Sequence, residues 1–124
     1  MSTKYTEDHE WARTEGDLLV IGITDYAQEQ LGEVVFVELP DIDRNLDQRE
    51  EAAVIESVKA AGEVKSPVGG TVVEVNESLN DNPEKINEDP SGDGWVYKIR
   101  PTDSNEFEAL MDDAAYNALV ETLS

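Results

Sequence analysis

The chain of 124 residues contains no cysteine, one histidine and only nine lysines and arginines. Without cysteine it cannot form disulfides, bind zinc through thiolates or attack a substrate with its own thiol. The shortage of basic side chains argues against binding to nucleic-acid phosphates or to an anionic membrane surface, because both need positive charge. No apolar run approaches the roughly 18 residues that a membrane-spanning helix requires.

Targeting features are also missing from the beginning of the sequence. Residues 1–8 contain neither an apolar core nor an Arg-rich amphipathic pattern, so we expect no secretory or mitochondrial targeting segment and a cytoplasmic protein. Apolar residues make up 39% of the chain, which is enough for a hydrophobic core. The length supports one domain, and we expect it to span residues 1–124.

Acidic side chains are abundant: 29 Asp and Glu give a formal net charge of −20. Three explanations compete: a surface adapted to high salt, docking onto basic partners, and mimicry of nucleic acid. The acids have replaced lysine along the whole sequence rather than in one tail, which favours adaptation to salt, as in a halophile. Solubility and folding measured from low to molar KCl test this hypothesis.

Short β-branched segments bounded by glycine, proline and polar residues predict strands. They lie at residues 17–23, 33–39 and 95–100. Between the first two, Asp25 is expected to cap a short helix that Gly32 ends. Residues 80–94 are rich in Pro, Asn, Asp and Gly and predict a surface loop. An i, i+3, i+4, i+7 pattern from Tyr116 to Leu123 predicts an amphipathic C-terminal helix.

Residues 51–76 carry the most regular pattern. It predicts, in order, a half-buried strand at 53–58, a turn at 59–62, a strand at 63–66, a turn at 67–70 and a strand at 71–75. These pieces together predict a compact antiparallel β unit. With the other segments they indicate a mainly β domain with a short internal helix and a C-terminal helix.

The sequence lacks the patterns typical of most catalytic and metal-binding sites. Residues 41–45 resemble the start of a calcium loop, but Leu46 and Ala52 stand where such a loop has Gly and Glu. Any His-containing metal site or Ser-His-Asp triad would depend on His9 alone. A pair of catalytic carboxylates remains open, although nothing singles out two of the 29 acids. We therefore expect no metal site and assign no catalytic residue.

Lys59 is one of few lysines and lies in the predicted turn, between Val58 and the small residues Ala60 and Ala61. A side chain at the tip of a turn is accessible to a modifying enzyme. Two interpretations follow from the residues alone: an ordinary exposed lysine, or the attachment point of a cofactor on a mobile arm.

A set of short motifs spans most of the chain. They are HEW at 9–11, IGITDYAQ at 21–28, LGEVVFVELP at 31–40, ESVKA at 56–60, VKSPVGGTVVEVN at 64–76 and GW at 94–95. In content and order they resemble the motifs of the glycine cleavage system H protein family, from about residue 5 to the C-terminal helix. Biotin carriers have a similar hairpin but usually flank the lysine with Met, whereas Val58 and Ala60 stand here.

The resemblance implies a lipoyl/biotinyl-type barrel-sandwich hybrid and a carrier rather than an enzyme. Lys59 would carry lipoic acid in amide linkage. The aminomethyl group released from glycine would pass from glycine decarboxylase (P protein) to aminomethyltransferase (T protein). Dihydrolipoamide dehydrogenase (L protein) would reoxidise the dithiol, and a lipoyl ligase or transferase would attach the cofactor.

The resemblance also implies a surface cleft that receives the loaded arm. Carried over motif by motif, its wall would consist of Asp8, Glu10, Ile23, Gln30, Leu31 and Glu63. The chain departs from several relatives in having Gln30 where they have His, and Asp8 where they have Ser. Two alternatives stay open: a carrier that relays lipoyl groups to other complexes, and a cofactor-free acidic interaction module.

Overall fold

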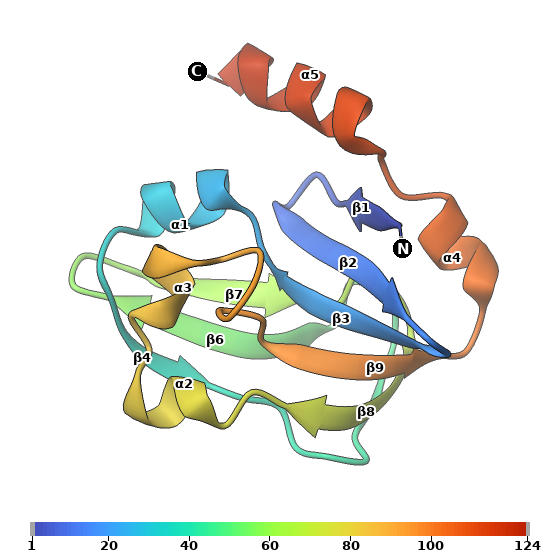
Figure 1. Cartoon of the computed structure of the whole chain (residues 1–124), viewed down its shortest axis with the longest axis horizontal. Coiled ribbons are helices and arrows are strands. Elements are labelled where there is room, and N and C mark those ends of the chain that lie inside the picture. Colours follow the sequence, from blue (N-terminus) through green and yellow to red (C-terminus); the bar gives the residue numbers. More distant parts are fainter. Residues whose placement is uncertain (1, 124) are drawn as a thin grey trace.

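Residues 2–123 are described by the computed structural model, and their strands form two antiparallel β-sheets (Figure 1). The larger sheet has the strand order β1-β2-β3-β9-β8-β5 and the smaller sheet the order β4-β6-β7. The larger sheet consists of β1 (Thr3–Tyr5), β2 (Glu10–Glu15), β3 (Leu18–Ile23), β5 (Asn45–Leu46), β8 (Gly70–Val75) and β9 (Tyr97–Pro101). The smaller sheet consists of β4 (Val34–Glu38), β6 (Glu51–Ser57) and β7 (Ala61–Lys65). The expected mainly β fold is confirmed.

Three of the helices lie between strands, and two follow the last strand. They are α1 (Asp25–Leu31), α2 (Ser78–Asp81), α3 (Lys85–Glu88), α4 (Ser104–Glu108) and α5 (Asp113–Leu123). Helix α1 contacts α3, whereas α5 lies beside β1 at the edge of the larger sheet (Figure 1). Within the described part of the chain, no helix combines the length and apolarity needed to cross a bilayer.

Both sheets contribute buried side chains to one hydrophobic core. Its members include Ile21, Val37, Ile55, Val72 and Ile99, each at most 1% exposed. Along β8 and β9 buried side chains alternate with less buried ones, as expected of strands with one solvated face, whereas β3 is buried on both faces. The core holds the two sheets together and fixes the strand ends from which the candidate site is built.

The antiparallel unit predicted for residues 51–76 is correct only in its first half. Strands β6 and β7 form a hairpin in the smaller sheet, but β8 leaves it and pairs with β5 and β9 in the larger sheet. Gly70 permits this crossing, because a Cβ there would overlap the carbonyl oxygen of Arg100 on β9. Alternation along a strand shows which side chains are buried, and it does not show which sheet the strand joins.

The surface loop predicted for residues 80–94 is wrong in two respects. The segment from Ser78 onward contains α2 and α3, and each buries one side chain, Leu79 and Ile86. Its carbonyl at Pro90 also accepts a hydrogen bond of 3.0 Å from the indole of Trp11. One apolar residue per short helix gives no periodic signal, so the packing role of this segment was not predictable from its composition.

The cap predicted for α1 lies one residue too late. The N-cap is Thr24, whose hydroxyl accepts a hydrogen bond from the backbone of Ala27, whereas Asp25 is the first helical residue. Gly32 ends the helix as predicted, with a φ of 83° that favours glycine. The predicted C-terminal helix is confirmed as α5, and Tyr116 is its buried residue.

Candidate functional site

Lys59 lies at the tip of the β6–β7 hairpin and is exposed, as predicted. The turn is narrower than predicted, because Ser57 closes it: the Ser57 hydroxyl accepts hydrogen bonds from the backbone amides of Lys59 (3.3 Å) and Ala60 (3.0 Å). Gly62, predicted to be part of the turn, already pairs with Ile55 across the hairpin. The lysine is therefore presented by two short, paired strands.

The aliphatic stem of Lys59 lies over Gly32, at the end of α1. A Cβ placed on Gly32 would be 3.2 Å from the Lys59 Cε atom, so the absence of a side chain leaves room for the stem. The carbonyl of Gly32 accepts a hydrogen bond of 2.8 Å from the side chain of Asn87 on α3. Helix α3 therefore fixes the surface over which the lysine passes.

A pocket of about 190 Å³ opens beside this surface. It contains all six residues that the sequence predicted for the cleft, together with five others. The predicted residues are Asp8, Glu10, Ile23, Gln30, Leu31 and Glu63, and the additional ones are His9, Ala27, Ile55, Gly62 and Val64. We call these eleven residues the docking pocket. The structure thus brings together side chains from the β1–β2 loop, β2, β3, α1, β6 and β7.

Burial divides the predicted residues into a mouth and a floor. Asp8, Gln30 and Glu63 are exposed, and they lie at the mouth. Ile23 is 4% exposed and Glu10 2% exposed, so an apolar side chain and a carboxyl group form the floor. A group entering the pocket therefore passes polar side chains before it reaches a shielded one.

Leu31 connects the docking pocket to the stem of Lys59. It precedes Gly32 in the chain and faces Gly62 on β7, where an added Cβ would be 3.0 Å from the Leu31 Cδ2 atom. The missing side chain at Gly62 thus leaves room for Leu31 between α1 and β7. An extension of Lys59 would meet the pocket next to its apolar wall.

Glu10 is the most unusual group of the pocket because its carboxyl is buried. Its two oxygens accept hydrogen bonds from the Thr6 hydroxyl (2.7 Å) and from the backbone amide of Lys65 (3.3 Å). Burial raises the pKa of Glu10 to about 7; the Thr6 hydrogen bond opposes this shift and the negative charge of Asp8 adds to it. Near neutral pH the group can therefore take up or release a proton in response to a nearby charge.

Three residues around the pocket were missed by the sequence reasoning. His9 lines the pocket, and Thr6 donates a hydrogen bond to the Glu10 carboxyl. The hydroxyl of Tyr116 on α5 lies 2.8 Å from the His9 Nδ1 atom. Burial lowers the pKa of His9, which favours its neutral form. The HEW motif at 9–11 drew attention to His9 without indicating a role, and no local pattern connects it to a tyrosine 107 positions away.

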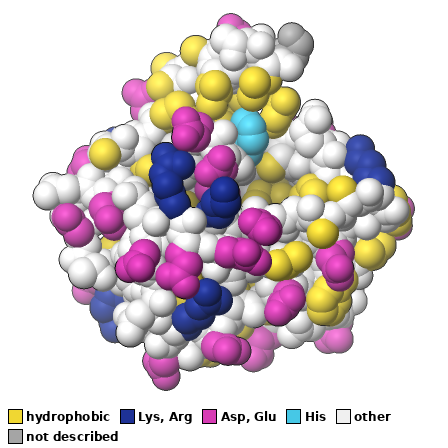
Figure 2. All heavy atoms as spheres, turned by 180° about the vertical axis from the view of Figure 1, so that it is seen from behind, with side chains coloured by type: hydrophobic (Ala, Val, Ile, Leu, Met, Phe, Trp, Pro, Cys, Tyr) yellow, Lys and Arg dark blue, Asp and Glu magenta, His cyan; other side chains and the backbone are white. Residues whose placement is uncertain are grey.

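Charge is spread over the surface rather than gathered at the pocket. Figure 2 shows acidic side chains across the face seen from behind, with few basic ones between them. Ion pairs such as Arg44–Glu50 and Arg49–Glu7 join exposed groups and contribute little to stability. Over the described residues, no group of three or more His, Cys, Asp or Glu is placed to hold a metal ion.

Comparisons with known proteins agree on one family. The family model for the glycine cleavage H-protein matches residues 3–123. Curated relatives named glycine cleavage system H protein include those of Parvibaculum lavamentivorans (54% identity; 97% of this chain and 96% of the relative) and Thermus thermophilus (47%; 95% and 92%). The crystal structure of a glycine cleavage system H protein from Mycobacterium marinum is similar, with a TM-score of 0.85, 35% identity and 94% of each chain covered.

Proposed function

Because the chain belongs to the glycine cleavage H-protein family, we propose that it carries lipoic acid in amide linkage on Lys59 and shuttles the aminomethyl group of glycine between enzymes. The resemblance found in the sequence is thereby confirmed at the level of the family. One observation carries the proposal for this chain: an exposed lysine on a hairpin tip lies with its stem against Gly32, next to a pocket with a buried carboxyl group.

The hairpin suits covalent attachment of an arm. An attaching enzyme reaches Lys59 without unfolding anything, because Val58 is 67% exposed and the lysine itself is exposed. Formation of the amide removes one positive charge, so the formal net charge changes from −20 to −21. When bound, the lipoyl group supplies a cyclic disulfide that takes up the aminomethyl group and two electrons, which this cysteine-free chain cannot supply itself.

The docking pocket suits an arm that ends in an ammonium group. Ile23 and Leu31 offer apolar contact to a thioether, and the Glu10 carboxyl lies at the floor to pair with the positive charge. An incoming ammonium favours the ionised carboxylate, so Glu10 would release its proton as the arm enters. Asp8, Gln30 and Glu63 would contact the arm at the mouth.

The proposed partners follow from this role. Glycine decarboxylase would load the arm, aminomethyltransferase would unload it, and dihydrolipoamide dehydrogenase would reoxidise the dithiol. A lipoyl ligase or transferase would modify Lys59 beforehand. On this proposal the chain is a carrier subunit without catalytic residues of its own, and it acts where these enzymes act, in the cytoplasm.

A reconstituted exchange reaction tests the proposal. The lipoylated protein is mixed with glycine decarboxylase, glycine and ¹³C-bicarbonate, and incorporation of label into the glycine carboxyl group is measured. We expect incorporation that requires both the lipoylated protein and the decarboxylase. Absence of exchange with a fully lipoylated protein would contradict a role in glycine cleavage.

The same preparation separates the alternatives. Incubation with an unmodified lipoyl domain of another complex and a lipoyl-transferring enzyme tests the relay role, which predicts loss of lipoyl from Lys59 to that domain. A cofactor-free acidic module predicts that a lipoyl ligase leaves Lys59 unmodified. Each outcome is read by intact mass.

A further inference from the structure

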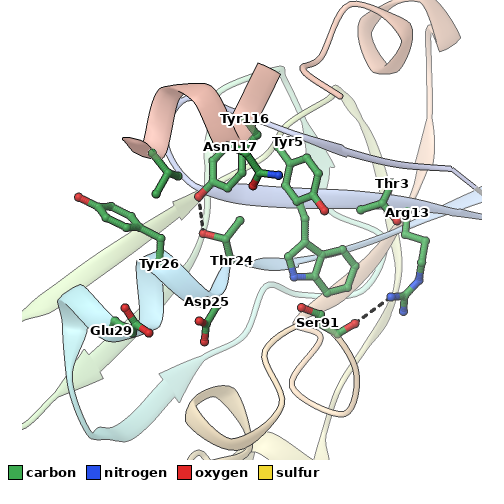
Figure 3. Close-up of a pocket in the computed structure, with 12 residues that line it drawn as sticks. Thr3, Tyr5, Arg13, Thr24, Asp25, Tyr26, Glu29, Ser91, Tyr116 and Asn117 are labelled. Carbon is green, nitrogen blue, oxygen red and sulfur yellow. Dashed lines mark hydrogen bonds between the residues drawn. The ribbon is translucent and has the colours of Figure 1, made fainter. Parts of the chain in front are cut away.

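Tyr116 is the buried side chain of the C-terminal helix α5. Next to it lies a second pocket of about 400 Å³, between α5, α1 and the first strands (Figure 3). Figure 3 shows the Tyr116 ring extending from α5 toward Thr24 at the start of α1. The helix is therefore anchored at a position where α1 begins.

The hydroxyl of Tyr116 makes two short hydrogen bonds. It lies 2.8 Å from the His9 Nδ1 atom and 2.6 Å from the Thr24 Oγ1 atom, the contact marked by a dashed line in Figure 3. A phenolic hydroxyl can donate one hydrogen bond and accept another, so both contacts can be satisfied at once. One oxygen atom of α5 thus joins two separate segments of the chain.

Each of these two segments supplies one wall of the docking pocket. His9 lies between Asp8 and Glu10, and it lines the pocket itself. Thr24 is the N-cap of α1, whose last turn supplies Gln30 and Leu31. The Tyr116 hydroxyl therefore contacts both a residue that lines the pocket and the N-cap of the helix that lines it.

His9 has an unfavourable backbone conformation that surrounding hydrogen bonds and ring contacts hold in place. Its φ is 71°, in the left-handed region that a non-glycine residue seldom adopts. The backbone of the loop is held by hydrogen bonds from the His9 amide to Thr6 and from the Thr24 amide to the His9 carbonyl. The imidazole is packed against Tyr26, with ring centroids 4.6 Å apart, and its Nδ1 atom bonds to Tyr116.

The Tyr116 ring is fixed independently of its hydroxyl. It stacks on Tyr5 of β1 with centroids 4.7 Å apart and nearly parallel planes. Tyr5 in turn exchanges backbone hydrogen bonds with Met111, just before α5. Removing only the hydroxyl would therefore leave the ring in place and remove the side-chain connection between His9 and Thr24, while the backbone hydrogen bond from the Thr24 amide to the His9 carbonyl remains.

We propose that Tyr116 is a positioning residue for the docking pocket: its hydroxyl fixes the His9 side chain against Thr24 at the start of α1, and with it the loop that carries Asp8 and leads into Glu10. The inference rests on the proposed function, because it concerns how long the loaded arm stays in that pocket. Tyr116 does not touch the arm. It acts through His9 and Thr24.

The direct test compares Tyr116→Phe with Tyr26→Phe. The Tyr26 hydroxyl makes no hydrogen bond to another described residue, so the control removes an equivalent atom without cutting the connection. Lipoylated proteins are loaded with glycine labelled with ¹³C at the α-carbon, and the enzyme is removed. The lifetime of the labelled methylene against hydrolysis to formaldehyde, ammonia and the free thiol is followed by NMR, and its line width reports whether the arm is held.

We expect Tyr116→Phe to shorten this lifetime about three- to tenfold, the range for one net hydrogen bond, and to narrow the methylene resonance. Tyr26→Phe should behave like the wild type. In a Glu10→Gln background the effect of Tyr116→Phe should be less than about twofold, because the two changes then act on the same contact. Thr24→Ser, which keeps a hydroxyl, should retain the lifetime that Thr24→Ala loses, and this pair replaces Tyr116→Phe if that variant fails to fold.

A lifetime and line width in Tyr116→Phe equal to those of the wild type would overturn the inference. Equal losses in Tyr116→Phe and Tyr26→Phe, or full additivity with Glu10→Gln, would also overturn it, since the loss would then not pass through the hydroxyl and the pocket. Failure of the proposed function looks different: the wild type itself would not be lipoylated or would take up no label.

Discussion

The hairpin that carries Lys59 and the segment that carries Glu10 lie close to one pocket but are built in opposite ways. At the hairpin tip the flanking Val58 is 67% exposed, and the turn is closed by hydrogen bonds between Ser57 and the backbone of Lys59 and Ala60. The Glu10 side chain is 2% exposed and is fixed by Thr6 and by the backbone of Lys65.

This difference matches two requirements of a carrier. The attachment point has to be reached by several enzymes, so it must be exposed and free of tight packing. The receiving pocket has to shield a reactive group and recognise its charge, so it must be preorganised and partly dry. Residues at the hairpin tip should thus control modification, and residues in the pocket should control retention.

Lys59→Arg removes the proposed attachment point of the cofactor from the hairpin tip. A guanidinium cannot form the same amide, so we expect complete loss of lipoylation and of glycine-dependent exchange. Thermal unfolding should be unchanged, because the side chain is exposed. Lys65→Arg on β7 is the matched control and should remain a substrate for the lipoyl ligase. Lipoylation of the Lys59→Arg protein would show that another residue carries the cofactor.

Glu10→Gln should weaken the binding of the loaded arm in the docking pocket without affecting lipoylation of Lys59. Loss of a charge-assisted hydrogen bond to the ammonium should shorten the lifetime of the loaded arm by about 10- to 100-fold, while Lys59 is lipoylated normally. Glu63→Gln removes an exposed carboxylate at the mouth and should cost less than about fivefold. The NMR assay of the labelled methylene measures both. A larger loss in Glu63→Gln would reverse the assignment of floor and mouth.

The buried carboxyl group of Glu10 makes the stability of the fold depend on pH. Because the pKa of Glu10 is raised from 4.5 to about 7, the folded protein retains a proton that the unfolded chain releases. The contribution of this proton to the free energy of unfolding is fully present below pH 4.5 and is lost as the pH rises to about 7. The free energy of unfolding of the wild type, relative to Glu10→Gln, should therefore fall by about 3 kcal/mol between pH 4 and 8. Urea unfolding measures this difference. A difference in the free energy of unfolding between the two proteins that stays constant from pH 4 to 8 would contradict a buried, protonated Glu10.

Gly32, which lies beside the Lys59 stem, can be compared with Gly16, another glycine with a positive φ. Gly32→Ala and Gly16→Ala both place a Cβ at a positive φ and should each lower the free energy of unfolding by about 1 to 3 kcal/mol. Only at Gly32 would the new atom meet another side chain, the stem of Lys59 at 3.2 Å, whereas nothing lies within 4 Å at Gly16. Gly32→Ala alone should therefore change the lifetime of the loaded arm, by about two- to threefold. An equal change of this lifetime in Gly16→Ala would show that Gly32 has no specific effect on the arm.

Much of the fold was predictable because strands with a β-branched, alternating pattern reveal themselves locally. This holds for β3, β4, β6 and the hairpin tip at Lys59, and for the i, i+3, i+4, i+7 pattern of α5. The sheet joined by β8 was not predictable, because it depends on a close approach of Gly70 to Arg100. Helices α2 and α3 were missed because each buries only one side chain.

The pocket shows a different division. Its six expected residues came from the resemblance of motifs, and no periodicity could have grouped them, since they lie in separate segments from Asp8 to Glu63. The burial of Glu10 and the roles of Thr6 and Tyr116 depend on side-chain atoms that meet only in the folded chain. Motifs thus predicted which residues gather, whereas the structure shows which of them is buried.

Lys59 is the proposed attachment point of the lipoyl arm, and the mass of the protein from its native host shows directly whether the arm is there. Intact mass spectrometry with peptide mapping should show about 188 Da added to the peptide that contains Lys59, and no addition elsewhere. An unmodified Lys59 in protein from glycine-grown cells would contradict the account.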